Sequence, residues 1–327
     1  MLVASLLLLL GLVLLIAGGD ALVRGSVALA TRLRISPTIV GLTVVAFGTS
    51  TPELVVNLTA AIKGTGDLAF GNVVGSNIAN IGLLLGVTAL VRPLVAHRTI
   101  IVREVPMMLL VCLVLLAEAE SAILEGRSHV FSRGDGLILL LLFGVFMYYL
   151  IGDALKQRAE DAYVHGMEAR THGKPMAAGL MLVLIGGGLA VLIVGGQMTV
   201  RGATDLAMGL GVPEVVIGLT LVAVGTSLPE LATSVIAVRQ GQTDIAIGNI
   251  VGSCIYNVAL VFGATSMIAT VALPAGGVVD LLVMAGLSAL LLPIVLTHGK
   301  VSRMEGGLML TIYAAYIAWL AGRSVTA

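Results

Sequence analysis

Long apolar runs alternate with short polar connections along almost the whole chain. At roughly 20 apolar residues per membrane-spanning helix, this pattern predicts ten spans. They are expected near residues 2–23, 35–62, 67–91, 103–124, 134–153, 176–200, 212–238, 243–271, 275–297 and 304–322. The runs are too long for the strands of a membrane β-barrel. The pattern therefore predicts an all-α integral membrane protein.

Two 40-residue stretches, 41–80 and 218–257, repeat each other at a constant offset of 177 residues, without a gap and with 22 identical positions. The repeat divides the chain into two halves of five spans each, 1–155 and 176–327, joined by a linker at 156–175. Because five is an odd number, the second half must enter the membrane upside down. We therefore expect an inverted-topology repeat.

Composition supports the membrane assignment. Hydrophobic residues make up 58% of the chain and charged residues 11%, against roughly 45–50% and 25% in soluble domains. Lys plus Arg equals Asp plus Glu at 18 each, so net charge indicates no nucleic-acid partner. The expected partner is the lipid bilayer, around a monomer. Cys112 and Cys254 lie in apolar segments and indicate neither a disulfide framework nor a metal site.

The distribution of positive charge predicts the orientation. With the N-terminus outside, 13 of the 18 Lys and Arg residues fall on the inner side, as the positive-inside rule requires. The first apolar run has no basic residue before it and no small-residue cleavage pattern, so we expect a first span and not a signal peptide. This arrangement predicts a multi-pass protein of the cell (inner) membrane, with both termini extracytoplasmic and a cytoplasmic linker.

Each repeat places a proline and a glutamate in the middle of an apolar span, as Pro52-Glu53 and Pro229-Glu230. A proline inside a helix costs about 3 kcal/mol and frees a backbone carbonyl, and a carboxylate at the membrane centre costs about 2.5–3.5 kcal/mol on insertion scales. Hydroxyls lie within one helical turn of each acid, and a second motif, G-N-x-x-G-S, adds a serine to each repeat. These hydroxyl residues are Thr49, Ser50, Ser76, Thr226, Ser227 and Ser253.

Two carboxylates and many neutral oxygens, without His, Cys or Lys, favour hard cations such as Ca²⁺, Na⁺ or Mg²⁺. The two acids can neutralise one divalent ion or hold several Na⁺ ions in turn. Without a cation, two close acids cannot both stay charged, so one binds a proton. A membrane hydrolase needs an Asp pair, a Ser–His pair or a zinc site, and none is visible, so we expect no enzyme. A channel is the remaining class, but two mirrored halves favour exchange.

The paired motifs G-T-S-x-P-E and G-N-x-x-G-S-x-x-x-N resemble the α-repeats of Na⁺/Ca²⁺ exchangers in the cation/Ca²⁺ antiporter superfamily, and the resemblance covers the whole chain. The H⁺/Ca²⁺ branch is less similar, because it typically carries G-N-x-x-E at the first motif. The resemblance implies a Na⁺/Ca²⁺ antiporter of prokaryotic type without a regulatory domain, working by alternating access and needing no cofactor. An H⁺/cation exchanger is the alternative, since a proton on Glu53 or Glu230 could replace Na⁺.

The resemblance also implies a ligand set for the transported Ca²⁺ and Na⁺. By position it comprises Glu53, Glu230, Thr49, Ser50, Ser76, Thr226, Ser227 and Ser253, the backbone carbonyls of Ala46 and Ala223, and Asn80 and Asn257. Some members, notably the K⁺-dependent exchangers, carry Asp where this chain has Asn257. We therefore expect exchange that does not require K⁺. The resemblance further implies that spans 1 and 6 move past the core on their glycines, Gly18, Gly19, Gly195 and Gly196.

Overall fold

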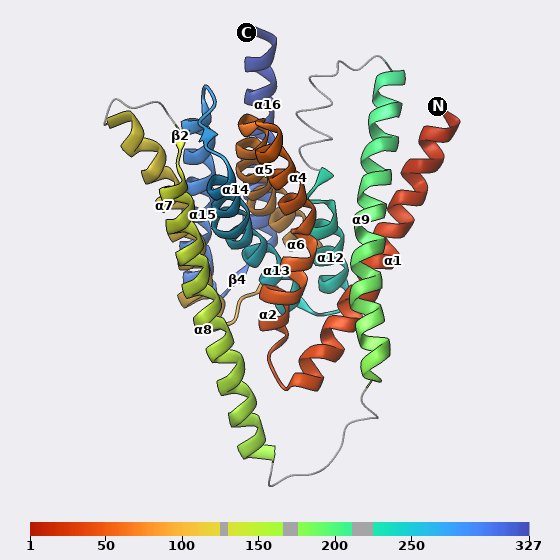
Figure 1. The fold of residues 1–327 in the computed structure, drawn as a ribbon. Helices are drawn as coiled ribbons and strands as arrows, with labels where there is room; N and C mark the ends of the chain where they lie inside the picture. The colour runs from red at the N-terminus through yellow and green to blue at the C-terminus, as the bar shows by residue number, and fades with distance from the viewer. Residues whose placement is uncertain (125–129, 166–175, 211–224, 327) are drawn as a thin grey trace.

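The computed structural model describes residues 1–124, 130–165, 176–210 and 225–326. Most of these residues form helices that run between the two ends of an elongated bundle (Figure 1). The first half contains α1 (Leu2–Leu33), α2 (Pro37–Val40), η1 (Gly41–Val45), α3 (Ala46–Thr49), α4 (Thr51–Lys63), α5 (Gly66–Ala79), η2 (Asn80–Leu84), α6 (Leu85–Val91), η3 (Ile100–Glu104), α7 (Val105–Leu124) and α8 (Arg133–His165), where η marks a π-helical segment. The second half contains α9 (Ala178–Gly209), α12 (Leu228–Arg239), α13 (Thr243–Ile255), η5 (Tyr256–Phe262), α14 (Gly263–Ile268), α15 (Gly277–His298) and α16 (Arg303–Thr326).

Eight of the described helices are long and apolar enough to cross a membrane, and a bent helix over Pro37–Lys63 makes a ninth. The remaining expected span, 212–238, is described only from residue 225, where α12 forms its second half. The ten-span count therefore stays a prediction. Both ends of the chain lie at the same end of the bundle (Figure 1). The chain is an all-α multi-pass membrane protein, as the apolar pattern predicts.

Three helices extend beyond their predicted ends. Helices α1 and α9 each have 32 residues, about 48 Å at 1.5 Å per residue, and a hydrocarbon core is about 30 Å thick. The sequence-based ends at residues 23 and 200 were too early, because a length of one span was assumed and a charged residue, Arg24 or Arg201, follows each. Helix α8 continues to His165, so the first ten residues of the expected linker are helical. The part of the linker at 166–175 lies outside the described residues.

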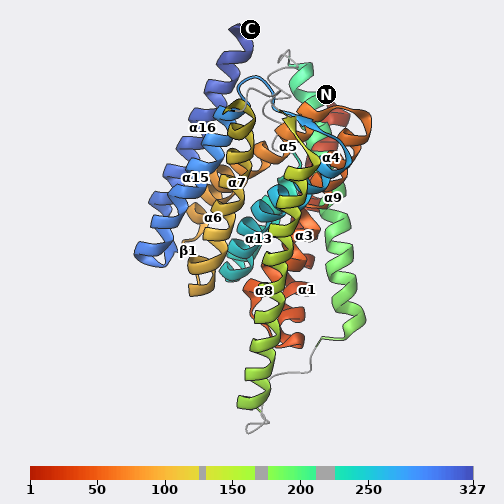
Figure 2. The ribbon, with the colours of Figure 1, turned by 60° about the vertical axis from the view of Figure 1, so that its left-hand side comes forward.

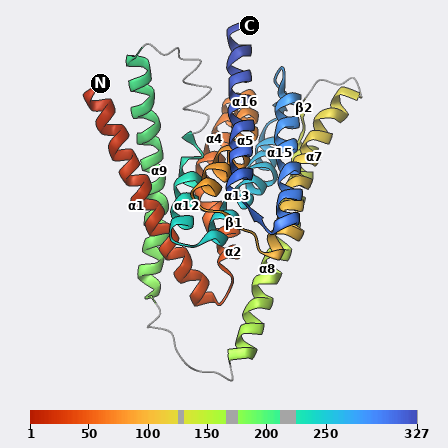
Figure 3. The same ribbon diagram turned by 180° about the vertical axis from the view of Figure 1, so that it is seen from behind.

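Helices α1 and α9 pack against each other along their length, apart from the central helices (Figure 3). The two run in opposite directions, since Gly11 of α1 meets Gly195 of α9 and Gly18 meets Gly188. A Cβ atom on Gly18 would lie 2.8 Å from the carbonyl oxygen of Gly188. Only glycine allows two backbones to approach so closely. Equivalent helices of the two halves thus lie antiparallel, as an inverted repeat requires.

Two short strand pairs at opposite ends of the bundle support the same symmetry. Strand β1 (Leu94–Val95) pairs antiparallel with β4 (Lys300–Val301), and β2 (Val130–Phe131) pairs antiparallel with β3 (Val271–Ala272). Strands β1 and β3 are 177 residues apart, the offset of the sequence repeat. Strand β2 lies toward the upper end of the bundle and β4 toward the lower end (Figure 1).

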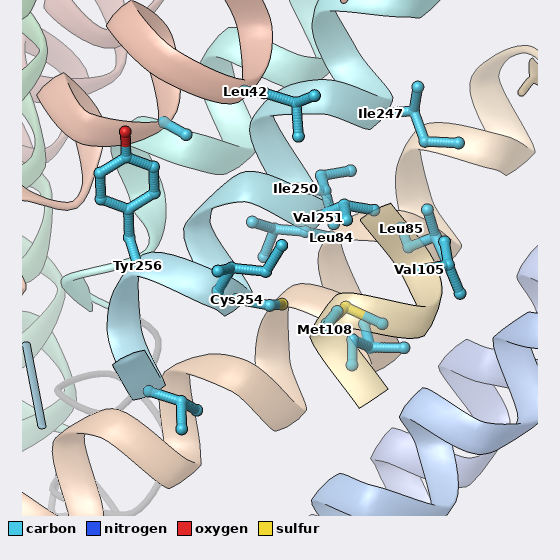
Figure 4. Close-up of a cluster of buried hydrophobic side chains, with 14 of the residues drawn as sticks. Leu42, Leu84, Leu85, Val105, Met108, Ile247, Ile250, Val251, Cys254 and Tyr256 are labelled. Atoms are coloured by element: carbon cyan, nitrogen blue, oxygen red, sulfur yellow. The ribbon is translucent and has the colours of Figure 1, made fainter. Parts of the chain in front are cut away.

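The centre of the bundle is formed by the equivalent helices α5–η2–α6 and α13–η5–α14, whose spans are 78% and 94% buried. Helix α13 crosses the bundle obliquely behind α8 (Figure 2). On one side, Ile250 and Val251 of α13 pack with Leu84, Leu85 and Met108 in a dry apolar cluster (Figure 4). This packing holds the polar positions of α5 and α13 in the middle of the protein.

Candidate functional site

The predicted Pro-Glu pairs lie where a helix is broken and restarts. Helix α3 ends at Thr49, α4 begins at Thr51, and the two are bent by 43°. Ser50 at the break has φ −83° and ψ 5°, and Ser227 has φ −88° and ψ 4°. Each proline falls in the first turn of the following helix, where its missing N–H leaves no hydrogen bond unmade. The sequence thus predicted the disruption correctly, and the structure shows a restart at both positions.

Both glutamates are completely buried. Glu53 lies in the first turn of α4 and Glu230 in the first turn of α12. Free backbone N–H groups and the positive end of the helix dipole favour a carboxylate in a first turn. The two acids are also close enough to interact electrostatically with each other. The broken helices therefore bring two negative groups together inside the bundle, as the sequence repeat predicted.

Hydrogen bonds across the two repeats connect the hydroxyls to this centre. The Ser50 hydroxyl donates to Glu230 Oε1 at 3.2 Å. The Thr49 hydroxyl donates to Asn249 Oδ1 at 3.1 Å, and the equivalent Thr226 hydroxyl donates to Asn72 Oδ1 at 3.4 Å. Each broken helix is thus attached to the central helix of the other repeat. Ser76 also lies here, 3.4 Å from the Thr226 hydroxyl oxygen.

Asn72 and Asn249 are absent from the ligand set inferred from the sequence, although they stand 177 residues apart in the G-N-x-x-G-S motif. Each receives the threonine hydroxyl and donates its own Nδ2, from Asn72 to Asn57 Oδ1 at 2.5 Å and from Asn249 to Ser234 Oγ at 3.0 Å. Asn57 and Ser234 occupy equivalent repeat positions too. The constant offset was the signal that could have identified this supporting layer.

Several buried oxygens at the centre make no hydrogen bond to any described residue. They are both carboxylate oxygens of Glu53, Oε2 of Glu230, Oδ1 of Asn80 and Asn257, and the hydroxyls of Ser227 and Ser253. A buried oxygen without a partner costs about 1–3 kcal/mol, and a cation coordinated by these oxygens would remove that cost. Among the described residues, no three His, Cys, Asp or Glu side chains cluster together. The donor set therefore consists of two carboxylates with neutral oxygens, which suits Ca²⁺ and Na⁺ and not Zn²⁺ or Cu.

The backbone carbonyls of the expected ligand set differ in what is known of them. The Ala46 carbonyl accepts the Ser50 N–H at 3.0 Å and keeps one lone pair. Ala223 lies outside the described residues. The glycines expected to let helices approach do so in the second repeat, where a Cβ on Gly248 would lie 2.8 Å from the Thr38 carbonyl oxygen. The equivalent neighbours of Gly71 and Gly75 would fall within residues 211–224, outside the described part.

A cavity of about 300 Å³ reaches the edge of this centre from one side. It lies between α4 and α9, and Thr226 contributes to both the cavity and the hydrogen-bonded centre. Its lining is mainly apolar, with Gln197 and Arg201 of α9 as polar members. Pro52 and Pro229, the residues before the two acids, also line it. A cation can therefore approach the acids between α4 and α9.

The equivalent space between α1 and α12 is closed. Gly19 of α1 is covered by Ile236 of α12, since a Cβ on Gly19 would lie 2.5 Å from the Ile236 Cδ1 atom. Beyond it, Gln240 Nε2 donates to Asp20 Oδ1 at 2.8 Å, and Asp20 also pairs with Arg24 at 2.9 Å. By contrast, a Cβ on Gly196, the equivalent of Gly19, would meet only Pro229, at 3.7 Å. The two repeats share a sequence pattern but differ in conformation.

Comparisons with known proteins agree with these features. The family model described as sodium/calcium exchanger protein matches residues 3–152 and 180–322. The chain is 37% identical to the inner membrane protein YrbG of Escherichia coli, over 82% of this chain and 81% of that protein. It is 38% identical to the putative antiporter CaxA of Alkalimonas amylolytica, over 97% and 98%. A solved structure of the sodium-calcium exchanger NCX_Mj, soaked with Na⁺ and Sr²⁺, superposes with a TM-score of 0.79 at 31% identity, covering 97% of this chain and 98% of that one.

Proposed function

Because the chain belongs to the sodium/calcium exchanger family, we propose that it exchanges Na⁺ for Ca²⁺ across the membrane at the site between Glu53 and Glu230. The chain is a transporter of the cation antiporter class and not an enzyme. The observation that carries the ion assignment is the set of buried oxygens without a protein partner, two carboxylates among them. Two negative charges balance one Ca²⁺. The same oxygens can instead hold Na⁺ ions, so the two ions compete for one site.

The ligands of this proposal come from equivalent positions of the two repeats. Glu53 and Glu230 supply the charge, and Asn80, Asn257, Ser227 and Ser253 supply neutral oxygens. Thr49, Ser50, Ser76 and Thr226 carry hydroxyls next to them, and Ala46 and Ala223 add backbone carbonyls. Because each broken helix is bonded to the other repeat's central helix, a cation bound here would be held by both repeats at once.

The conformational difference between the repeats supports alternating access. The site is approached between α4 and α9 and closed between α1 and α12. Exchanging the conformations of the two repeats would bring Gly196 and Gln197 of α9 against α4, as Gly19 and Asp20 of α1 now lie against α12. Because α1 and α9 pack so closely with each other, they would move together. The orientation inferred from positive charge puts the open side outside the cell, in the inner membrane to which the similar protein YrbG is assigned.

Reconstituted transport tests the proposed function directly. Purified protein in proteoliposomes should move Ca²⁺ when a Na⁺ gradient is imposed, at the same rate with and without K⁺. A pH jump in Na⁺-free medium should drive little Ca²⁺ movement. Ca²⁺ flux that follows the pH jump and ignores Na⁺ would instead establish H⁺/cation exchange, and steady current without any counter-ion would indicate a channel.

Protons are expected to inhibit by competition. A proton on either Glu53 or Glu230 removes the charge that Ca²⁺ needs, and proximity of two acids makes protonation easier. The apparent affinity for Ca²⁺ should therefore fall as pH falls, and the maximal rate should be recovered at saturating Ca²⁺. The measurement is the Ca²⁺ concentration dependence of flux at several pH values, with both sides at equal pH. An affinity that stays constant from mildly acid to alkaline pH would contradict a shared carboxylate site.

A further inference from the structure

We propose that Asn77 is a positioning residue that holds the Asn257 amide with its carbonyl oxygen directed to the transported cation. The proposal rests on the proposed function, because it assigns a role toward the same site. Asn77 lies in α5 and is completely buried, and Asn257 lies in η5 of the other repeat. Asn77 is not part of the ligand set that the sequence motif implies.

A chain of two hydrogen bonds determines how both amides face. Asn77 Nδ2 donates to the backbone carbonyl oxygen of Cys254 at 3.1 Å. Asn257 Nδ2 donates to Asn77 Oδ1 at 3.2 Å. A backbone carbonyl can only accept, so it requires the NH₂ group of Asn77 on its side. The Asn77 oxygen that then faces Asn257 can also only accept, so residue 257 must present its own NH₂ group.

The remaining atom of the Asn257 amide is Oδ1, which is buried and makes no hydrogen bond to any described residue. With Nδ2 engaged by Asn77, this oxygen is available to a cation. If the amide turned over, two acceptor oxygens would face each other and an NH₂ group would replace the ligand oxygen. A buried polar group left unpaired in this way is costly. Asn77 therefore selects the productive orientation before the ion arrives.

The other repeat has a related arrangement with different chemistry. The residue equivalent to Asn77 is Cys254, and the residue equivalent to Asn257 is Asn80. The Asn80 side chain lies beside the Cys254 thiol, and Asn80 Oδ1 is likewise buried without a described hydrogen-bond partner. A thiol is a weak acceptor compared with an amide oxygen. The amide of Asn257 is therefore held more firmly than that of Asn80.

The same chain of hydrogen bonds selects the residue type at position 257. An ionised aspartate would put a carboxylate oxygen against Asn77 Oδ1, and neither atom could donate. Asn77 could not turn over to help, because its Nδ2 faces a backbone carbonyl. Asn77 thus favours a neutral ligand at position 257 and limits the acids of the centre to Glu53 and Glu230.

A matched pair of variants tests the role of Asn77. Asn77→Thr keeps a hydroxyl that can accept from Asn257 and donate to the Cys254 carbonyl, whereas Asn77→Val has the same shape without it. Removing a partner that orients a metal ligand typically lowers affinity about 10–100-fold. We expect Asn77→Val to weaken Ca²⁺ binding to the purified protein by about tenfold or more, and Asn77→Thr to weaken it less. Ser288→Ala, which removes a buried hydroxyl bonded to Cys112 and Met284, is the control and should bind as the wild type does.

A double-mutant cycle separates positioning from simple packing. Asn257→Ala removes the ligand itself, so adding Asn77→Val should cause no further loss of affinity if Asn77 acts through Asn257. Losses that multiply, or Thr and Val variants that bind equally, would overturn the proposal. If Asn77→Val is not monodisperse in detergent, Asn77→Thr takes its place in the same cycle. Absence of Ca²⁺ binding by the wild type would contradict the proposed function and not only the role of Asn77.

Discussion

Replacing either Glu53 or Glu230 by glutamine is expected to reduce Na⁺-dependent Ca²⁺ flux to background. Each variant leaves one carboxylate for a divalent cation in a site of low dielectric, where an unbalanced charge is costly. Glutamine has the same shape as glutamate, so packing around the site is preserved. It also lowers the cost of membrane insertion by removing an ionisable group at the centre, which is about 2.5–3.5 kcal/mol on insertion scales for an acid. Loss of flux would therefore not reflect loss of stability.

The matched control is Glu104→Gln. Glu104 is also a buried glutamate, but it accepts a hydrogen bond from the Tyr149 hydroxyl at 2.9 Å and has no role in the proposed site. A glutamine carbonyl oxygen can accept the same bond, so near wild-type flux is expected. Flux should be measured in proteoliposomes containing equal amounts of monodisperse protein. Near-normal Na⁺-dependent flux in either Glu53→Gln or Glu230→Gln would exclude a site shared by the two acids.

Joining α1 to α12 should stop transport with the site still able to bind Ca²⁺. Asp20 and Gln240 are in direct contact on the closed side, and exchange of the two conformations requires them to separate. In an Asp20→Cys/Gln240→Cys variant, a short disulfide-forming cross-linker should abolish flux, and a reducing agent should restore it. Calcium binding should persist, because the path between α4 and α9 remains open.

Two comparisons make this result specific. Each single-cysteine variant should keep its flux in the presence of the cross-linker, since the native Cys112 and Cys254 are buried. The equivalent positions of the other repeat, Lys63 and Gln197, should be joined poorly at rest and more rapidly when Na⁺ and Ca²⁺ drive turnover. Undiminished flux through a fully cross-linked Asp20–Gln240 pair would rule out movement of α1 relative to α12.

The local features of the site could be predicted from sequence because their causes are local. Hydropathy sets the spans, and proline ends a hydrogen-bonded helix wherever it occurs, so the breaks before Glu53 and Glu230 follow from their neighbours alone. The constant offset of 177 residues joined the two acids into one expected centre. The ends of α1 and α9 were predicted less well, because long tilted helices are stabilised by packing against each other and not by hydropathy within one window.

Contacts between the repeats required the tertiary structure. Ser50 with Glu230, Thr49 with Asn249, and Asn77 with Asn257 join residues about 200 positions apart, and their pairing depends on how the two halves are rotated and inclined. The supporting asparagines have no charge, proline or unusual hydropathy to single them out. Two nearly identical motifs also cannot indicate which repeat is open and which is closed. That difference arises from how α1 and α9 lean together on the central helices, so the sequence by itself determined the site's chemistry and its duplication, whereas packing decided its geometry and the side from which an ion can enter.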